Sequence, residues 1–112
     1  MGQFKVGQVV TSAFPYSDLR TNKHRPALIV AIVDFDNPIL CQITSKPYSS
    51  TIAIELSEQD FTSGGLPVKS YIRPDKLFTA EHSIVSTIYG ALKPEKLRDT
   101  LSTLRNIFVD TQ

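Results

Sequence analysis

Three short stretches of the sequence carry side chains that could bind or polarise an anion such as a phosphate. They are His24 with Arg25, Thr44 with Ser45, and Arg73 with Asp75. An arginine offers planar, permanently charged N–H donors, and a hydroxyl adds a neutral donor. A guanidinium and a hydroxyl that converge on one spot form a site for a phosphate or an oxyanion. The function therefore depends on whether the fold brings these stretches together.

Each stretch also has an ordinary structural explanation when it is taken alone. Arg25 could be a solvated strand end paired with a carboxylate, and His24 could be exposed and idle. The hydroxyls could bond to local backbone. If the chain stays extended after Thr44, only one of the two hydroxyls can face a given site. Arg73 and Asp75, two residues apart on one face of an extended segment, could form a structural ion pair.

The segment Arg25–Val33 predicts a strand buried on both faces, because seven apolar residues follow Pro26 without polar alternation. Pro26 biases Arg25 towards an extended conformation and so holds the guanidinium where the strand meets solvent. A turn-rich segment follows, and Ile39–Ile43 is therefore predicted to be the antiparallel hairpin partner. The start of one strand then adjoins the end of the other, which makes Arg25 and Thr44 neighbours.

The remaining apolar patterns predict a mainly β protein with one helix at the C-terminal end. Further strands are predicted at Gly7–Phe14, Thr51–Leu56, Val68–Ile72 and Ile84–Tyr89, loops at Tyr16–Lys23 and Ser63–Pro67, a helical turn at Ser57–Asp60 and a turn at Ala80–Ser83. Pro94 suits the first position of a helix over Pro94–Val109. Its apolar stripe comprises Leu97, Leu101, Leu104 and Phe108. Six short strands and this helix predict a small curled antiparallel sheet or partly open barrel.

Length and composition are those of one ordinary globular domain, which we expect to span residues 1–112. The formal net charge of +1 gives no global signal for nucleic acid or membrane, so any anion site must be local. Cys41 is the single cysteine and is predicted to be a buried core thiol. His24 and His82 stand in no metal-ligand motif, so neither a metal nor a cofactor is expected. Without a signal peptide or a long apolar run, a cytoplasmic protein is expected.

Four motifs in sequence order, followed by the amphipathic helix, resemble the PemK/MazF toxins of bacterial toxin–antitoxin systems. The motifs are Gly7-Gln8-Val9-Val10, Arg25-Pro26-Ala27-Leu28-Ile29-Val30, Cys41-Gln42-Ile43-Thr44-Ser45 and Ser70-Tyr71-Ile72-Arg73-Pro74-Asp75-Lys76-Leu77. Each motif is short, but their order and spacing together cover nearly the whole chain. The resemblance implies an SH3-like barrel of the CcdB/PemK type, a homodimer and a cognate antitoxin partner. It also implies a metal-independent endoribonuclease that cuts single-stranded RNA at short sequences.

When the family's functional residues are matched to positions in this sequence, they fall in the same three stretches that were selected above from their side-chain chemistry. It implies catalytic roles for Arg25, Thr44, Arg73 and Asp75, and we expect RNA contacts from His24, Ser45, Lys46 and Lys76. The implied reaction is attack of a 2′-hydroxyl on its own phosphate, which leaves a 2′,3′-cyclic phosphate and a 5′-hydroxyl. Arg25 and Thr44 would stabilise the charge of the phosphorane, and either Asp75 or His24 would be the base.

Two other functions are compatible with the same sequence. A CcdB-like toxin would bind a protein target such as a gyrase, using the C-terminal helix and the adjoining surface, and would have no nuclease chemistry. A catalytically lapsed member of the family would serve only as a binding module.

Overall fold

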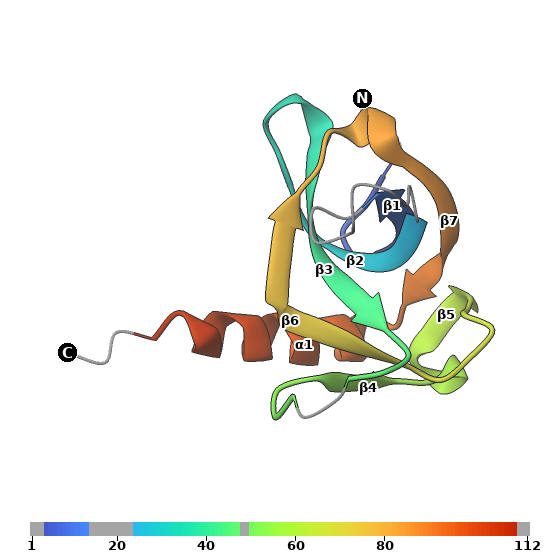
Figure 1. Ribbon diagram of the computed structural model, residues 1–112, viewed down its shortest axis with the longest axis vertical. Coiled ribbons are helices and arrows are strands. Elements are labelled where there is room, and N and C mark those ends of the chain that lie inside the picture. Colours follow the sequence, from blue (N-terminus) through green and yellow to red (C-terminus); the bar gives the residue numbers. More distant parts are fainter. Residues whose placement is uncertain (1–3, 14–23, 48–49, 110–112) are drawn as a thin grey trace.

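Seven antiparallel strands form one curled sheet in a computed structural model that describes residues 4–13, 24–47 and 50–109. The strands are β1 (Gln8–Ala13), β2 (His24–Val33), β3 (Asn37–Thr44), β4 (Ile54–Leu56), β5 (Phe61–Gly64), β6 (Ser70–Thr79) and β7 (Val85–Leu92). Their order across the sheet is β4-β6-β3-β2-β1-β7-β5. Figure 1 shows that the sheet curves into a half-barrel, with the helix α1 (Pro94–Ile107) lying across one end of it. The predicted class, a small antiparallel barrel with a C-terminal helix, is confirmed.

The predicted hairpin is confirmed, and it forms the centre of the sheet. β2 and β3 pair antiparallel with Ala27 opposite Gln42 and Val33 opposite Asn37. Residues 27–30 are buried on both faces, as the unbroken apolar run predicts, whereas residues 31–33 are half-buried or exposed. The two-sided burial is therefore limited to the middle of β2.

Four boundaries differ from the sequence-based prediction. The expected strand Thr51–Leu56 is shortened to β4, and the expected loop Ser63–Pro67 begins inside the additional strand β5. Arg73-Pro74-Asp75 does not end a strand, because β6 continues through these residues. The pairing of β6 with β3 is irregular at this point. β7 runs past Gly90. Phe14 and the loop Tyr16–Lys23 lie outside the described residues.

Gly90 continues the strand because it stands opposite Gly64, where two backbones approach closely. A Cβ on Gly90 would lie 2.3 Å from the Ser63 carbonyl oxygen, and one on Gly64 would lie 2.0 Å from the Tyr89 carbonyl oxygen. Gly64 also has a φ of 67°, which favours glycine. The sequence pattern suggested a strand end, but the glycine serves close packing between β5 and β7.

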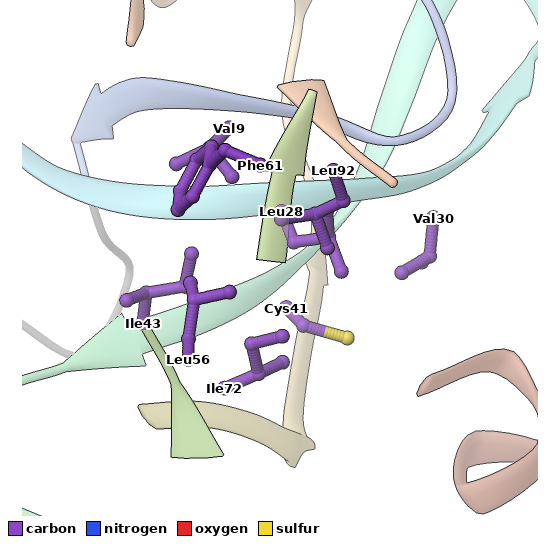
Figure 2. Close-up of a cluster of buried hydrophobic side chains, with 9 residues drawn as sticks. All are labelled: Val9, Leu28, Val30, Cys41, Ile43, Leu56, Phe61, Ile72 and Leu92. Carbon is purple, nitrogen blue, oxygen red and sulfur yellow. The ribbon is translucent and has the colours of Figure 1, made fainter. Parts of the chain in front are cut away.

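Two apolar clusters lie on the two faces of the central strands. Figure 2 shows the larger one, in which nine buried side chains from all seven strands meet, among them Leu28, Ile43 and Ile72. Cys41 belongs to it and is fully buried, as predicted. Burial, with a smaller contribution from the nearby Asp75 carboxylate, raises the pKa of the Cys41 thiol to about 12. The thiol is therefore protonated at neutral pH and takes part in packing.

The helix is confirmed, although it ends two residues earlier than predicted. Pro94 occupies its first turn, and Leu101 and Leu104 pack against the larger apolar cluster. Phe108 does not belong to this stripe, because it follows the last helical turn and is 69% exposed. No helix among the described residues is long and apolar enough to cross a membrane.

The turn of the β2–β3 hairpin holds an aromatic residue in a strained conformation. Phe35 has a φ of 64° and is 86% exposed, and the next residue, Asp36, has a φ of 61°. A side chain other than Gly, Asn or Asp costs about 1 kcal/mol or more in this region. We expect Phe35→Asn to raise the free energy of unfolding by about 1 kcal/mol, because asparagine tolerates the left-handed conformation. Urea denaturation measures this change.

Phe35→Ala is the matched control for this prediction. Alanine removes the exposed ring but keeps a Cβ in the left-handed region, so it should recover little of the strain. Equal stabilisation by both variants would show that loss of the ring, and not relief of strain, is responsible.

Candidate active site

A pocket of about 270 Å³ lies where β2 begins and β3 ends. Arg25, Thr44 and Ser45 line one part of it, so the structure brings together the guanidinium and the hydroxyls that the hairpin register predicted to be neighbours. Arg25 is exposed, Thr44 is half-buried and Ser45 is exposed. The pocket therefore offers permanent positive charge and neutral donors to a ligand that arrives from solvent.

Both hydroxyl residues reach the pocket because the chain bends at Ser45 and does not stay extended. The expectation that only one could face the site was made for an extended chain, and this condition is not met. Thr44 Oγ1 accepts a hydrogen bond from the Lys46 backbone N–H at 3.1 Å and donates to the Lys46 carbonyl at 3.3 Å. The donated bond is long, so exchanging it for a bond to a phosphate oxygen costs little. The local backbone bond and a site role are thus compatible.

Arg73 and Asp75 form a bidentate ion pair on β6, as their two-residue spacing predicted. Arg73 Nε donates to Asp75 Oδ1 at 3.1 Å, and Nη2 donates to Oδ2 at 2.9 Å. Neither residue lines the pocket described above. Gln42 on β3 stands opposite both Ala27 on β2 and Arg73 on β6. Arg73 therefore shares a sheet face with Arg25 and lies about two strand spacings, or roughly 10 Å, across from β2.

Hydrogen bonds from the Arg73 guanidinium hold the pKa of the Asp75 carboxyl below its usual value. A carboxyl with a lowered folded-state pKa contributes stability above its unfolded pKa of about 4, and this stability is lost as pH falls through the folded pKa. We expect Asp75→Asn to lower the free energy of unfolding by up to about 1 kcal/mol between pH 5 and 8, because the pair is partly exposed. The difference between parent and variant should shrink as the pH falls through the lowered folded-state pKa of Asp75.

Urea denaturation of the parent and Asp75→Asn at several pH values measures this difference. The same series with Glu95→Gln is a control, because Glu95 is an exposed carboxylate in the first turn of α1. A stability difference for Asp75→Asn that persists unchanged at acid pH would contradict the assignment of the ion pair as its source.

The other expected RNA-binding residues lie around the pocket or beside the ion pair. His24 is exposed at the start of β2, next to Arg25. Lys46 is exposed and follows the hydroxyls, and Lys76 is half-buried next to Asp75 on β6. None of these three side chains lines the pocket. Their expected RNA contacts would therefore lie outside the pocket.

The opposite part of the pocket was not predicted from the sequence. It is formed by Leu66, Pro67, Val68 and Tyr89, together with Ser70. These residues come from the segment before β6, from the first residue of β6 and from the middle of β7, and no local pattern links them. The burial of the Gln42 side chain was also not predicted from the sequence. Its Oε1 is buried and has no hydrogen-bond partner. Among the described residues, no three His, Cys, Asp or Glu side chains gather to hold a metal ion.

The fold and the pocket define a small antiparallel half-barrel with a pocket lined by Arg25, Thr44 and Ser45 at the end of its central hairpin. A family model described as the PemK-like, MazF-like toxin of type II toxin–antitoxin systems matches residues 5–108. The match covers nearly the whole chain, and the chain belongs to this family of toxins. No curated protein sequence matches it significantly.

Solved structures of MazF proteins and endoribonucleases share the fold. An endoribonuclease from a mycobacterial species has a TM-score of 0.69 at 17% identity, covering 95% of this chain and 91% of its own. MazF from Deinococcus radiodurans has a TM-score of 0.69 at 14% identity, covering 96% of each chain. The MazE–MazF complex from the same organism has a TM-score of 0.68 at 15% identity, covering 92% of each chain.

Proposed function

We propose that this toxin is an endoribonuclease that cleaves single-stranded RNA at short sequences and needs no metal ion. The observation that carries the proposal is the convergence of Arg25, Thr44 and Ser45 on one pocket. Family membership supports it, as do structural relatives that are endoribonucleases. RNA contains its own nucleophile, the 2′-hydroxyl, so a site that stabilises the phosphorane and moves protons is chemically sufficient.

In the proposed reaction the 2′-oxygen attacks the adjacent phosphorus while the bond from phosphorus to the 5′-oxygen breaks. The products are a 2′,3′-cyclic phosphate and a 5′-hydroxyl. Arg25 donates to the non-bridging oxygens, whose negative charge increases in the transition state, and Thr44 adds a hydroxyl donor. Because a guanidinium stays protonated in proteins, its contribution is electrostatic and not a proton transfer.

A base must take the proton of the 2′-hydroxyl, and an acid must protonate the 5′-oxygen. His24 precedes Arg25 at the exposed start of β2, outside the lining of the pocket, and histidine is the residue type that most often transfers protons near neutral pH. The Asp75 carboxyl has a lowered pKa and already accepts two bonds from Arg73, which makes it a weak base. We therefore propose that His24 takes the proton of the 2′-hydroxyl and returns it to the leaving 5′-oxygen, and we assign the Arg73–Asp75 pair to charge and orientation on the neighbouring sheet face.

The proposal includes a cognate antitoxin and a homodimer in the cytoplasm, where RNA substrates occur. Two of the structural relatives are complexes with an antitoxin, one from a mycobacterial species and one from Deinococcus radiodurans. An acidic or apolar segment of an antitoxin that covers a groove between the two protomers of the dimer would block access to Arg25. Ser45 would contact the RNA backbone inside the pocket, and Lys46 and Lys76 would contact it outside the pocket.

The test is cleavage of mixed-sequence single-stranded RNA by the purified protein in EDTA, followed by analysis of the product ends. We expect 2′,3′-cyclic phosphates and 5′-hydroxyls. A single 2′-deoxy substitution at the nucleotide before the cut should abolish cleavage there, because it removes the nucleophile, while the same substitution elsewhere should not. Cleavage at the substituted position, or 5′-phosphate products, would contradict the mechanism.

One surface favours a second candidate function, a CcdB-like toxin that binds a gyrase. Phe108 and Val109 are exposed at the end of α1, where such a target would bind. Inhibition of gyrase supercoiling without RNA cleavage would favour this function. RNA cleavage without an effect on gyrase would exclude it.

A further inference from the structure

We infer that the apolar part of the pocket is a nucleobase subsite in which Tyr89 stacks on a base that flanks the scissile phosphate. This inference rests on the proposed ribonuclease function and adds to it a residue that determines binding specificity. The pocket has two chemically different parts: a cationic and hydroxyl part at Arg25, Thr44 and Ser45, and an apolar part at Leu66–Val68 and Tyr89. A nucleotide has the same division, because one sugar joins a phosphate to a flat, largely apolar base.

The apolar part of the pocket includes side chains that remain exposed to solvent in the folded protomer. Val68 is 59% exposed and Tyr89 is 37% exposed, and both line the same pocket as the charged residue Arg25. Aromatic side chains next to cationic ones are the usual arrangement for single-stranded nucleic acid, because bases stack on the ring while the backbone follows the charge. The apolar surface and Arg25 thus fit a single ligand.

The walls of this subsite are held in place before any ligand binds. The Gly65 backbone N–H donates to the Tyr89 carbonyl at 3.1 Å, and Leu66 packs against the larger apolar cluster. The Ser70 hydroxyl, which is buried, donates to the Val68 carbonyl at 3.0 Å. A base that enters therefore meets a rigid platform, and little conformational entropy is lost when it binds.

The charges behind the apolar wall indicate which part of the RNA lies there. A second pocket of about 490 Å³ shares Leu66, Pro67 and Val68 and also contains Glu55 and Glu58. Lys69 pairs with Glu55 at 2.7 Å, which leaves the second pocket with a net negative charge. A phosphate directed over the wall would approach these carboxylates, whereas an uncharged base stops at the apolar surface. The backbone therefore stays on the side of Arg25.

The test separates base binding from backbone binding and does not require cleavage. Two labelled ligands of equal length are compared by fluorescence anisotropy: a mixed-sequence 2′-O-methyl RNA, and an abasic ribose-phosphate chain. We expect Tyr89→Ala to weaken binding of the RNA by about 5- to 150-fold, the range of one lost stacking contact. Binding of the abasic chain should change little. Tyr89→Phe should keep the affinity for RNA, because the ring remains.

Phe35→Ala is the control, since it removes an exposed aromatic ring at the opposite end of β2 from Arg25. It should change neither affinity. An equal loss for both ligands with Tyr89→Ala, or no loss, would overturn the inference. Unchanged RNA affinity with weakened antitoxin binding would overturn it too, because the apolar part would then receive a protein side chain.

Failure of this inference can be told apart from failure of the proposed function. Cleavage of unmodified RNA with no effect of Tyr89→Ala on RNA binding leaves the ribonuclease proposal intact and removes the subsite. Base-dependent binding that requires Tyr89, in a protein that cleaves no RNA, keeps the subsite and removes the nuclease.

Discussion

Arg25→Ala lowers kcat for RNA cleavage by about 100- to 1,000-fold, the usual effect of removing a donor that stabilises charge in a transition state. KM should change much less, because the phosphate carries most of its additional charge only when the phosphorane forms. Arg25→Lys should have an intermediate effect, since lysine keeps the charge but lacks the planar array of donors. Steady-state kinetics on a defined oligonucleotide measures both variants.

The free energy of unfolding should remain within about 0.5 kcal/mol of the parent value, because Arg25 is exposed at a strand end. Arg98→Ala is the matched control: it removes an exposed arginine on α1 that does not line the pocket, and it should retain full activity. Equal activity of the parent, Arg25→Ala and Arg98→Ala would rule out Arg25 as a catalytic residue. Thr44→Val should lose activity and Thr44→Ser should retain it, because only serine preserves the hydroxyl.

Gly90→Ala lowers the free energy of unfolding by about 3 kcal/mol, at the upper end of the range for overpacking a closely packed site. The added Cβ would stand 2.3 Å from a backbone oxygen of β5, and a backbone atom cannot rotate out of the way as a flexible side chain can. β5 and β7 must separate as a result. Denaturant unfolding of the purified variant measures the loss.

Gly65→Ala is the control for the contact, because a Cβ there would meet no atom within 4 Å. The loss in the free energy of unfolding for Gly65→Ala should come only from the backbone conformation and should be clearly smaller than the loss for Gly90→Ala. Similar losses for the two variants would show that the close approach of β5 and β7 is not the reason for glycine at residue 90. Because Tyr89 accepts the Gly65 N–H, separation of these strands should also disturb the proposed base subsite.

The features that could be predicted from the sequence depend on residues close together in the chain. The β2–β3 hairpin follows from an apolar run, a turn and a second apolar run, and it places Arg25 beside Thr44. The Arg73–Asp75 pair follows from the two-residue period of a strand. The helix follows from Pro94 and the spacing of its leucines. In each case the information lies within one or two neighbouring elements.

Features that join distant segments could not be predicted in this way. Gly90 looks like the end of a strand until Gly64 is placed opposite it. Phe108 continues the helical apolar stripe, but the helix ends before it and nothing packs over the ring in the described chain. The bend at Ser45, which places two hydroxyls in one pocket, depends on where β3 stops pairing.

By itself the sequence determined the central hairpin and the cationic mouth at Arg25, because these depend on residue type and on short-range periodicity, while the resemblance of four motifs indicated the family. Only the tertiary structure decided what lies opposite that mouth. The segment before β6 and the middle of β7 are separated by about twenty residues of chain, and β-sheet closure brings Val68 and Tyr89 to the same pocket. Pairing between distant strands depends on the register of the whole sheet, which no local pattern encodes.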